Sequence, residues 1–206
     1  MTGLFITLEG GDGVGKTTQA QLLTAWLEGL GRTVVRTREP GGTPLGAQLR
    51  ELLLHGTDPV DPRAEALLYA ADRAQHVSAL VRPALERGEV VLQDRYLDSS
   101  VAYQGAGRVL GAAEVRDLSL WATGALLPQL TVLLDLDPAL AAERRGARDG
   151  APGDRLESEK LDFHERVRAE FLALAAAEPD RFLVLDATAP IDQVHAAIRA
   201  RITPLL

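Results

Sequence analysis

GGDGVGKT, at residues 10–17, matches the pattern G-x-x-x-x-G-K-[ST]. An apolar run at residues 4–9 precedes it, and a helical pattern begins at Lys16. The glycines let several backbone N–H groups face one phosphate cluster, and the helix N-terminus adds its dipole. A strand before the pattern and a helix after it are the context that this motif requires, so residues 10–17 are predicted to form a phosphate-binding loop.

Two side chains of this loop carry specific chemistry. Lys16 is one of only two lysines beside twenty arginines, and it supplies a point charge to the β- and γ-phosphates of a nucleoside triphosphate. The Thr17 hydroxyl is a ligand for Mg²⁺. The residues predicted to hold ATP in this P-loop are Gly10, Gly11, Asp12, Gly13, Val14, Gly15, Lys16, Thr17 and Thr18.

Outward from the loop, apolar runs alternate with helical patterns. Strands separated by helices pair in parallel, and strands that are continuous apolar runs indicate a sheet covered on both faces. The predicted fold class is therefore α/β: a P-loop NTPase with a five-stranded parallel sheet, helices on both faces and one domain over residues 1–206. Strands are expected at residues 4–9, 33–38, 89–94, 130–136 and 182–185. Helices are expected at residues 16–30, 44–55, 61–87 (with a break or kink at Pro83), 111–123, 138–145, 156–177 and 190–202.

Composition excludes several other classes. The chain has 206 residues, 46% of them hydrophobic and 25% charged, as in one ordinary globular domain. It has no cysteine, which excludes a disulfide framework, a cysteine zinc site and a thiol nucleophile. The net charge of −7 does not suit binding of a nucleic-acid polymer. With no apolar run of membrane-spanning length and no signal-peptide pattern, a cytoplasmic location is expected and no membrane partner.

Charged residues at the strand ends indicate a second, phosphorylated substrate. Asp94 and Arg95 end the third expected strand and Arg38 ends the second, at the edge of a parallel sheet where ligands bind. With Arg73 on the long helix, three arginines converging there would clamp a phosphate. Asp94 is the candidate for a second Mg²⁺ ligand, the alternative being a strand-end cap.

Two further features narrow the reaction. The chain has no asparagine, so the N-K-x-D base-reading motif of a GTPase is absent. Residues 145–155, RGARDGAPGDR, form a long loop with almost no apolar content, which is typical of a lid or of disorder.

Motifs in the order of one family run along nearly the whole chain. They are EGGDGVGKTTQ (9–19), TREPGGT (37–43), YAADRAQH (69–76), DRYLDSSVAYQGAGR (94–108), LLDLDP (133–138) and GDRLE (153–157). In these motifs the chain resembles the bacterial thymidylate kinases. The resemblance implies transfer of the γ-phosphate of ATP to dTMP with Mg²⁺, giving dTDP and ADP for dTTP synthesis. It also implies a homodimer.

The resemblance also assigns the acceptor pocket. It implies that Asp12 accepts a hydrogen bond from the 3′-hydroxyl of the deoxyribose, that Tyr69 stacks on thymine, and that Arg95 grips the acceptor phosphate. Tyr103 then lies against C2′ and disfavours a ribose. The full set of expected acceptor residues is Asp12, Arg38, Tyr69, Arg73 (reaching thymine or the phosphate), Arg95, Ser100 (near a thymine ring nitrogen), Tyr103 and Gln104.

The positive charge that stabilises the transferred phosphoryl group is expected to come from arginines of the lid. Positions 12–14 of the loop hold no basic residue, so the chain resembles the family members that use lid arginines. A lid at residues 145–156 would bring Arg148 and Arg155 to the phosphoryl group and place Arg144 near adenine. The expected catalytic residues are Lys16, Asp94, Arg95, Arg148 and Arg155.

Two other functions stay open at this point. One is a P-loop kinase of another nucleoside monophosphate or of a phosphorylated metabolite. The other is a P-loop ATPase that signals by dimerisation, which would need neither an acceptor pocket nor an arginine-rich lid. A kinase that acts on dTMP or on another monophosphate needs no general base. A monophosphate has a second pKa near 6 and is therefore already ionised at pH 7. The four histidines are interpreted as structural or surface residues.

Overall fold

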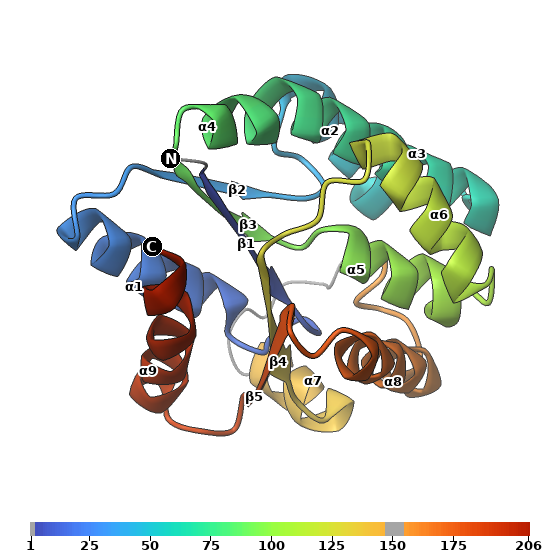
Figure 1. Ribbon diagram of the computed structural model, residues 1–206. Coiled ribbons are helices and arrows are strands. Elements are labelled where there is room, and N and C mark those ends of the chain that lie inside the picture. Colours follow the sequence, from blue (N-terminus) through green and yellow to red (C-terminus); the bar gives the residue numbers. More distant parts are fainter. Residues whose placement is uncertain (1–2, 147–154) are drawn as a thin grey trace.

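The structure is a computed structural model that describes residues 3–146 and 155–206. At its centre lies a parallel sheet of five strands in the order β2-β3-β1-β4-β5 (Figure 1). This confirms the predicted α/β class and the five-stranded parallel sheet. The strands are β1 (Leu4–Glu9), β2 (Val34–Arg38), β3 (Val90–Asp94), β4 (Leu130–Asp135) and β5 (Phe182–Asp186).

Strand register places the sequence motifs at one edge of this sheet. Leu8 of β1 lies opposite Asp94 of β3, and Asp94 in turn lies opposite Arg38 of β2. The glycine-rich loop therefore leaves β1 beside the ends of both neighbouring strands. The three charged strand-end positions and the loop meet at this carboxyl edge.

Helices cover both faces, as predicted (Figure 1). On one face Ile6 and Leu8 of β1 belong to a core cluster with Leu23 of α1 and Ile198 of α9. Phe5 points to the other face and belongs to a second core cluster, which α3, α5 and α8 help to form. The helices are α1 (Lys16–Gly29), α2 (Pro44–Arg50), α3 (Pro62–His76), α4 (Arg82–Glu86), α5 (Leu97–Ser100), α6 (Ala112–Thr123), α7 (Pro138–Gly146), α8 (Leu161–Ala177) and α9 (Ile191–Ile202). None of the helices described is long and apolar enough to cross a membrane.

The break or kink predicted at Pro83 takes the form of a π-helical turn that interrupts the α-helix just before this residue. α3 continues through a π-helical turn at Val77–Val81 directly into α4, with Pro83 in the first turn of α4. A proline lacks the N–H that the preceding turn would use, and its ring crowds the carbonyl four residues earlier. The wider π-turn just before Pro83 accommodates both, so the rod continues.

The two edge strands of the sheet are less buried than predicted. β1, β3 and β4 are buried along almost their whole length, whereas β2 and β5 alternate with exposed residues. The prediction of strands covered on both faces is therefore wrong for β2 and β5, because an edge strand has a neighbour on one side only.

Near the site, one helical segment and the start of another helix were not predicted. Residues 97–107 form α5 and a π-helical turn at Val101–Gly107, where no helix was expected. α8 begins at Leu161 rather than at residue 156, because Arg155 and Leu156 fold back against the rest of the chain. Both segments line the pocket described below.

Candidate active site

The glycine-rich loop has the backbone that its sequence predicts. Gly10 has φ 125°, and a Cβ there would lie 2.4 Å from the carbonyl oxygen of Leu134 on β4. Gly15 precedes α1 with φ 101°. Both positions require glycine, since other residues rarely adopt this backbone and Gly10 also has no room for a side chain.

Lys16 is folded back onto its own loop. Its Nζ donates to the carbonyl oxygens of Gly11, at 2.6 Å, and Gly10, at 3.1 Å, and lies 4.0 Å from Asp12. Burial lowers the pKa of Lys16, and the neighbouring Arg95 lowers it further. The loop carbonyls hold the ammonium group where phosphate oxygens would replace them as its partners.

Arg95 ties the loop to the turn after β3. Its Nη2 donates to Asp12 at 2.6 Å and to the Tyr103 hydroxyl at 3.3 Å, and its Nη1 donates to the Gly10 carbonyl at 3.1 Å. Burial raises the pKa of Tyr103 above its usual range, so this hydroxyl stays protonated and donates to Asp12. Arg95 has φ 65°, a strained backbone for a residue with a side chain, and such strain clusters at functional sites.

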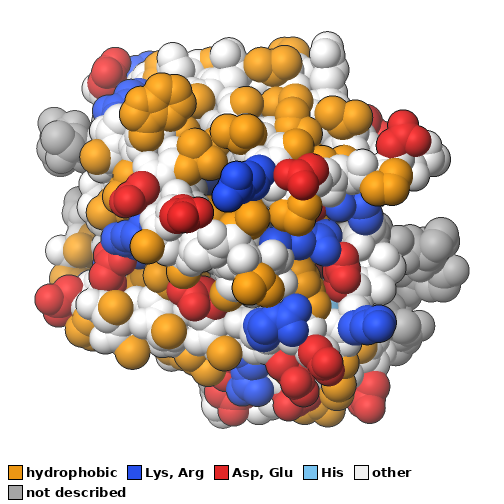
Figure 2. Space-filling model, turned by 90° about the vertical axis from the view of Figure 1, so that its right-hand side faces the viewer, with side chains coloured by type: hydrophobic (Ala, Val, Ile, Leu, Met, Phe, Trp, Pro, Cys, Tyr) orange, Lys and Arg blue, Asp and Glu red, His pale blue; other side chains and the backbone are white. Residues whose placement is uncertain are grey.

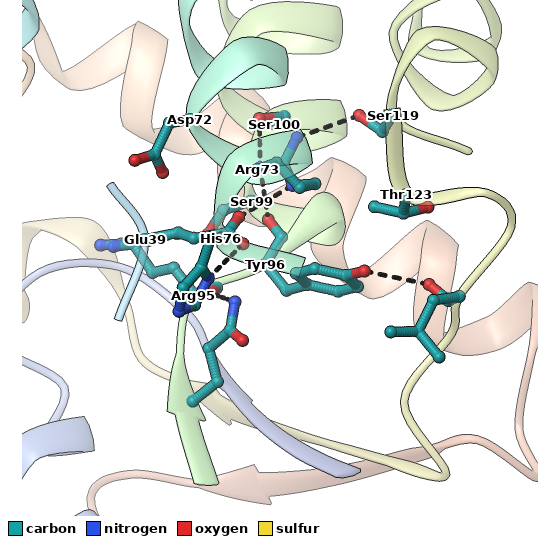
Figure 3. Close-up of polar contacts among 12 residues, drawn as sticks. Glu39, Asp72, Arg73, His76, Arg95, Tyr96, Ser99, Ser100, Ser119 and Thr123 are labelled. Carbon is teal, nitrogen blue, oxygen red and sulfur yellow. Dashed lines mark hydrogen bonds and ion pairs between the residues drawn. The ribbon is translucent and has the colours of Figure 1, made fainter. Parts of the chain in front are cut away.

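Arg73 lies in a separate, deeper network (Figure 3). Its Nε donates to Glu39 at 2.8 Å, its Nη1 to Ser119 at 3.2 Å, and its Nη2 to Ser100 at 2.9 Å and to the carbonyl of Tyr96 at 3.3 Å. In the close-up the guanidinium lies between these groups. Arg73 is only 2% exposed, so its charge is balanced inside the protein by Glu39.

Three of the pockets that adjoin the loop are named the inner, the loop and the outer pocket. The inner pocket contains the predicted aromatic and polar acceptor residues; its lining is Asp12, Glu39, Pro40, Arg50, Leu54, Tyr69, Arg73, Arg95, Tyr96, Ser99, Ser100, Tyr103, Gln104, Leu156 and Glu157. The loop pocket is more polar and is lined by Asp12, Gly13, Gly15, Lys16, Thr17, Thr18, Arg38, Glu39, Arg50, Asp94 and Arg95. The outer pocket lies on the other side of the loop and is lined by Gly13, Val14, Gly15, Thr18, Gln19, Leu134, Arg144, Ala187, Ala189, Ile191 and Val194.

The three predicted arginines do not converge on one point. Arg95 lines both the inner and the loop pocket, but Arg73 lines only the first and Arg38 only the second. Arg50 of α2 lines both and so takes the place expected of a third arginine. The sequence gives no local signal for Arg50, because it lies inside an ordinary helical pattern whose position depends on tertiary packing.

Asp94 and Thr17 both line the loop pocket. The Oδ1 atom of Asp94 is buried and has no hydrogen-bond partner among the residues described. A buried carboxylate oxygen without a partner is costly unless a cation or a donor satisfies it. The hydroxyl of Thr17 and this oxygen therefore fit Mg²⁺, a hard cation that takes oxygen ligands.

The arginines expected near the lid lie in different places. Arg144 donates to the Ala187 carbonyl at 2.9 Å and lines the outer pocket, and its place beside adenine stays a prediction. Arg155 instead bonds to Glu65, a fully buried carboxylate on α3, and to the carbonyl of Leu53. Arg148 and most of the predicted lid lie outside the described residues.

Glu65 was missed by sequence reasoning and joins two parts of the site. It accepts hydrogen bonds from Gln104 at 2.8 Å and from Arg108 at 3.4 Å as well as from Arg155. Gln104 lines the inner pocket, and residues 156–157 lie in the same lining. The segment after the predicted lid is thus fastened beside the inner pocket by Glu65.

Glu9, at the end of β1, holds the turn that carries Arg95. Its two oxygens accept from the Tyr96 N–H at 2.7 Å and from the Ser99 hydroxyl at 2.6 Å, and Ser99 in turn accepts from Arg95. Burial raises the pKa of Glu9 to about 8, and the nearby Asp98 adds to this. The hydrogen bonds from Ser99 and Tyr96 and the positive charge of Arg95 oppose the rise without cancelling it.

The raised pKa predicts how stability changes with pH. Between the ordinary value of 4.5 and about 8 the folded chain holds a proton on Glu9 that the unfolded chain has released. Stability from this group is therefore present at low pH and falls as pH rises, by about 1 kcal/mol per pH unit at most. We expect the free energy of unfolding of Glu9→Gln to rise relative to that of the wild type as the pH increases from 6 to 8.5. Urea denaturation measures both free energies. Parallel stability curves for the two proteins would contradict the assignment.

A parallel sheet whose central strand ends in this loop, with a second cationic pocket beside it, defines a P-loop NTPase that acts on a second substrate. The family model for thymidylate kinase matches residues 8–198. A thymidylate kinase of Leifsonia xyli subsp. xyli is 69% identical over 97% of this chain and 94% of its own length. One of Deinococcus radiodurans is 58% identical, over 98% of this chain and 97% of its own length. The chain belongs to the thymidylate kinase family.

Proposed function

We propose that this chain transfers the γ-phosphate of ATP to dTMP and releases dTDP and ADP. The observation that carries the proposal is the pair of pockets on either side of one P-loop. The outer pocket takes the base of ATP beside Arg144, and the inner pocket takes dTMP between Tyr69 and Tyr103. Arg95 lines the inner and loop pockets, where donor and acceptor phosphates would meet.

Positioning and charge neutralisation account for the chemistry. The acceptor phosphate is already an anion at pH 7, so the site needs no general base. Arg95 and Arg50 would hold it, and Lys16 would stabilise charge on the transferred group. Mg²⁺, held by Thr17 and Asp94, would neutralise the phosphates of ATP. The roles expected of Arg148 and Arg155 stay predictions.

Selection of the acceptor is proposed to come from the inner pocket. Tyr69 would stack on the pyrimidine, and Ser100 and Gln104 would meet its polar edge. Asp12 would accept from the 3′-hydroxyl, while Tyr103, packed edge-on against Phe163 at 6.0 Å, would leave little room for a 2′-hydroxyl. A P-loop ATPase with no acceptor would have no use for such a pocket. The cytoplasmic location stays a prediction.

The reaction is tested by following the transferred phosphorus. With ATP carrying ³²P at the γ position, Mg²⁺ and dTMP, the label should appear in dTDP in step with ADP formation. Label that appears only in inorganic phosphate would contradict the proposal.

We also propose a homodimer, supported by an apolar face on α3 and α6. Leu67 of α3 is 57% exposed and Trp121 of α6 is 82% exposed, and the two helices pack against each other. Figure 2 shows hydrophobic side chains gathered across the upper part of the side on which these helices lie. Exposed apolar clusters of this kind mark protein interfaces.

The dimer proposal predicts a change in mass after a single substitution. Trp121→Asp would place a charge in the apolar face, so we expect it to elute as a monomer with an unchanged far-UV spectrum. Val109→Asp, at another exposed apolar position, should keep the dimer. Light scattering after gel filtration measures both. A wild-type protein that is still a monomer at about 50 μM, far above a Kd of about 1 μM (about −8 kcal/mol), would overturn the proposal.

A further inference from the structure

A buried chain of polar contacts leads from Thr37 on β2 to Arg73. Figure 3 shows its part from His76 through Glu39 to Arg73. The Thr37 hydroxyl lies 2.7 Å from Nε2 of His76, and Nδ1 of His76 lies 2.9 Å from Oε1 of Glu39. The other oxygen of Glu39 accepts from Nε of Arg73. His76 has no exposed surface and Glu39 only 3%, so no solvent replaces these contacts.

The direction of these hydrogen bonds follows from Glu39. An ionised carboxylate only accepts, so Nδ1 of His76 carries the hydrogen and donates it. In the neutral ring Nε2 is then an acceptor, and the Thr37 hydroxyl donates to it. Without His76, Oε1 of Glu39 would be a buried acceptor with no partner among the described residues, which is unfavourable.

The same contacts limit what Arg73 can offer a ligand. A guanidinium has five N–H groups. Those on Nε and Nη2 and one on Nη1 are directed to Glu39, Ser100, Ser119 and the Tyr96 carbonyl. Among the described residues, one N–H of Arg73, on Nη1, has no protein partner in these contacts, and Arg73 lines the inner pocket. Arg73 therefore has one N–H left for a ligand and is not free to grip a phosphate with two.

A single fixed donor suits a keto oxygen of a pyrimidine. Thymine has an acceptor oxygen at position 4, where a cytosine has an amino group that only donates. A donor held rigidly in the pocket therefore favours thymine. With cytosine the same donor would face an amino group that also donates, which is unfavourable. A donor free to turn away would lose this discrimination.

We propose that His76 is a positioning residue which, through Glu39, fixes Arg73 as the donor that selects a 4-keto pyrimidine over a 4-amino one. The proposal rests on the proposed function, since it concerns the acceptor of that reaction. Gly42 adds an independent constraint on the ring: a Cβ there would lie 2.5 Å from Nε2 of His76 and 2.7 Å from the Thr37 hydroxyl oxygen. The backbone of the β2–α2 loop thus encloses the imidazole.

The test compares two amide substitutions, each of which replaces one ring nitrogen. In His76→Asn the side-chain amide takes the place of Nδ1 and keeps the donor to Glu39, whereas in His76→Gln it takes the place of Nε2 and leaves Glu39 unpaired. The readout is kcat/KM for dTMP divided by kcat/KM for 5-methyl-dCMP, which differ in the group at position 4 and in the hydrogen on the adjacent N3. We expect the ratio to fall about tenfold in His76→Gln and by less than about threefold in His76→Asn, since one unpaired buried acceptor is worth about a factor of ten.

A matched control separates positioning from stability. Val77 is the next residue along the chain, is 2% exposed and belongs to the apolar core, so Val77→Ala should lower the melting temperature and leave the ratio unchanged. KM for ATP should stay at its wild-type value in all variants. An unchanged ratio in folded His76→Gln, or an equal fall in His76→Asn, would overturn the inference.

Gly42→Ala provides a second route if His76→Gln does not fold. It keeps every polar group and adds one methyl group against the imidazole, so the same fall in the ratio is expected. A folded Gly42→Ala protein with the wild-type ratio would overturn the inference. A wild-type protein that does not phosphorylate dTMP at all would instead overturn the proposed function, so the two failures are distinguishable.

Discussion

Lys16→Ala is expected to abolish nearly all phosphoryl transfer while the fold stays intact. In the structure Lys16 is 7% exposed, and its ammonium group bonds only to loop carbonyls and, weakly, to Asp12 among the described residues. Its place at the start of α1 puts a positive charge beside the phosphates that the loop would bind. Removing a preorganised charge of this kind costs on the order of 10³-fold in kcat.

The chain supplies a control for this substitution, because its other lysine is Lys160, which is exposed in front of α8. Lys160→Ala should retain wild-type kcat and KM. Circular dichroism should give both variants the wild-type spectrum. A folded Lys16→Ala protein with more than a tenth of wild-type kcat would show that the loop lysine does not act on the transferred group.

Arg95→Ala is expected to lose activity to a similar extent, with an effect on KM for dTMP as well as on kcat. Arg95 contacts Asp12, Ser99, Tyr103 and the Gly10 carbonyl and lines both pockets where phosphates are proposed to meet. Its loss should raise KM for dTMP and lower kcat, together on the order of 10³-fold in kcat/KM. KM for ATP should change little, because the outer pocket lies on the far side of the loop.

The backbone at this position allows a sharper design. Alanine and glycine both remove the guanidinium, but only glycine adopts φ 65° without strain. Arg95→Gly should therefore be as inactive as Arg95→Ala and more stable, by about 1 kcal/mol. Arg87→Ala removes an arginine that is 57% exposed and should keep full activity. An active, folded Arg95→Gly protein would show that the side chain is not required.

Sequence patterns predicted the parts of the site that are local. The loop was found because its glycines, Lys16 and Thr17 are contiguous and lie between a strand and a helix. Asp94 and Arg95 were found because the end of a parallel strand has a known place in the fold. The burial of the two edge strands was predicted less well, since strand order is set by tertiary packing.

The parts that sequence reasoning missed depend on partners from distant elements. Arg50 reaches both pockets because Thr43 caps α2, with its hydroxyl accepting from the Gly46 N–H, and thereby fixes the direction of the helix. His76 was interpreted as structural or surface, since nothing in YAADRAQH shows that Glu39 of another motif will lie beside it. Arg155 was assigned to the lid by its motif, whereas its partner Glu65 lies 90 residues earlier.

The most direct test of the account offers different acceptors one at a time. ADP production from ATP and Mg²⁺ is measured with dTMP, dUMP, UMP, dCMP or dGMP, and without an acceptor. The account predicts rapid ADP formation with dTMP, slower formation with dUMP, and little with UMP, dCMP or dGMP. ADP formed at the same rate with and without every acceptor would make the chain an ATPase and would contradict the roles given to Tyr69, Arg95 and Tyr103 together.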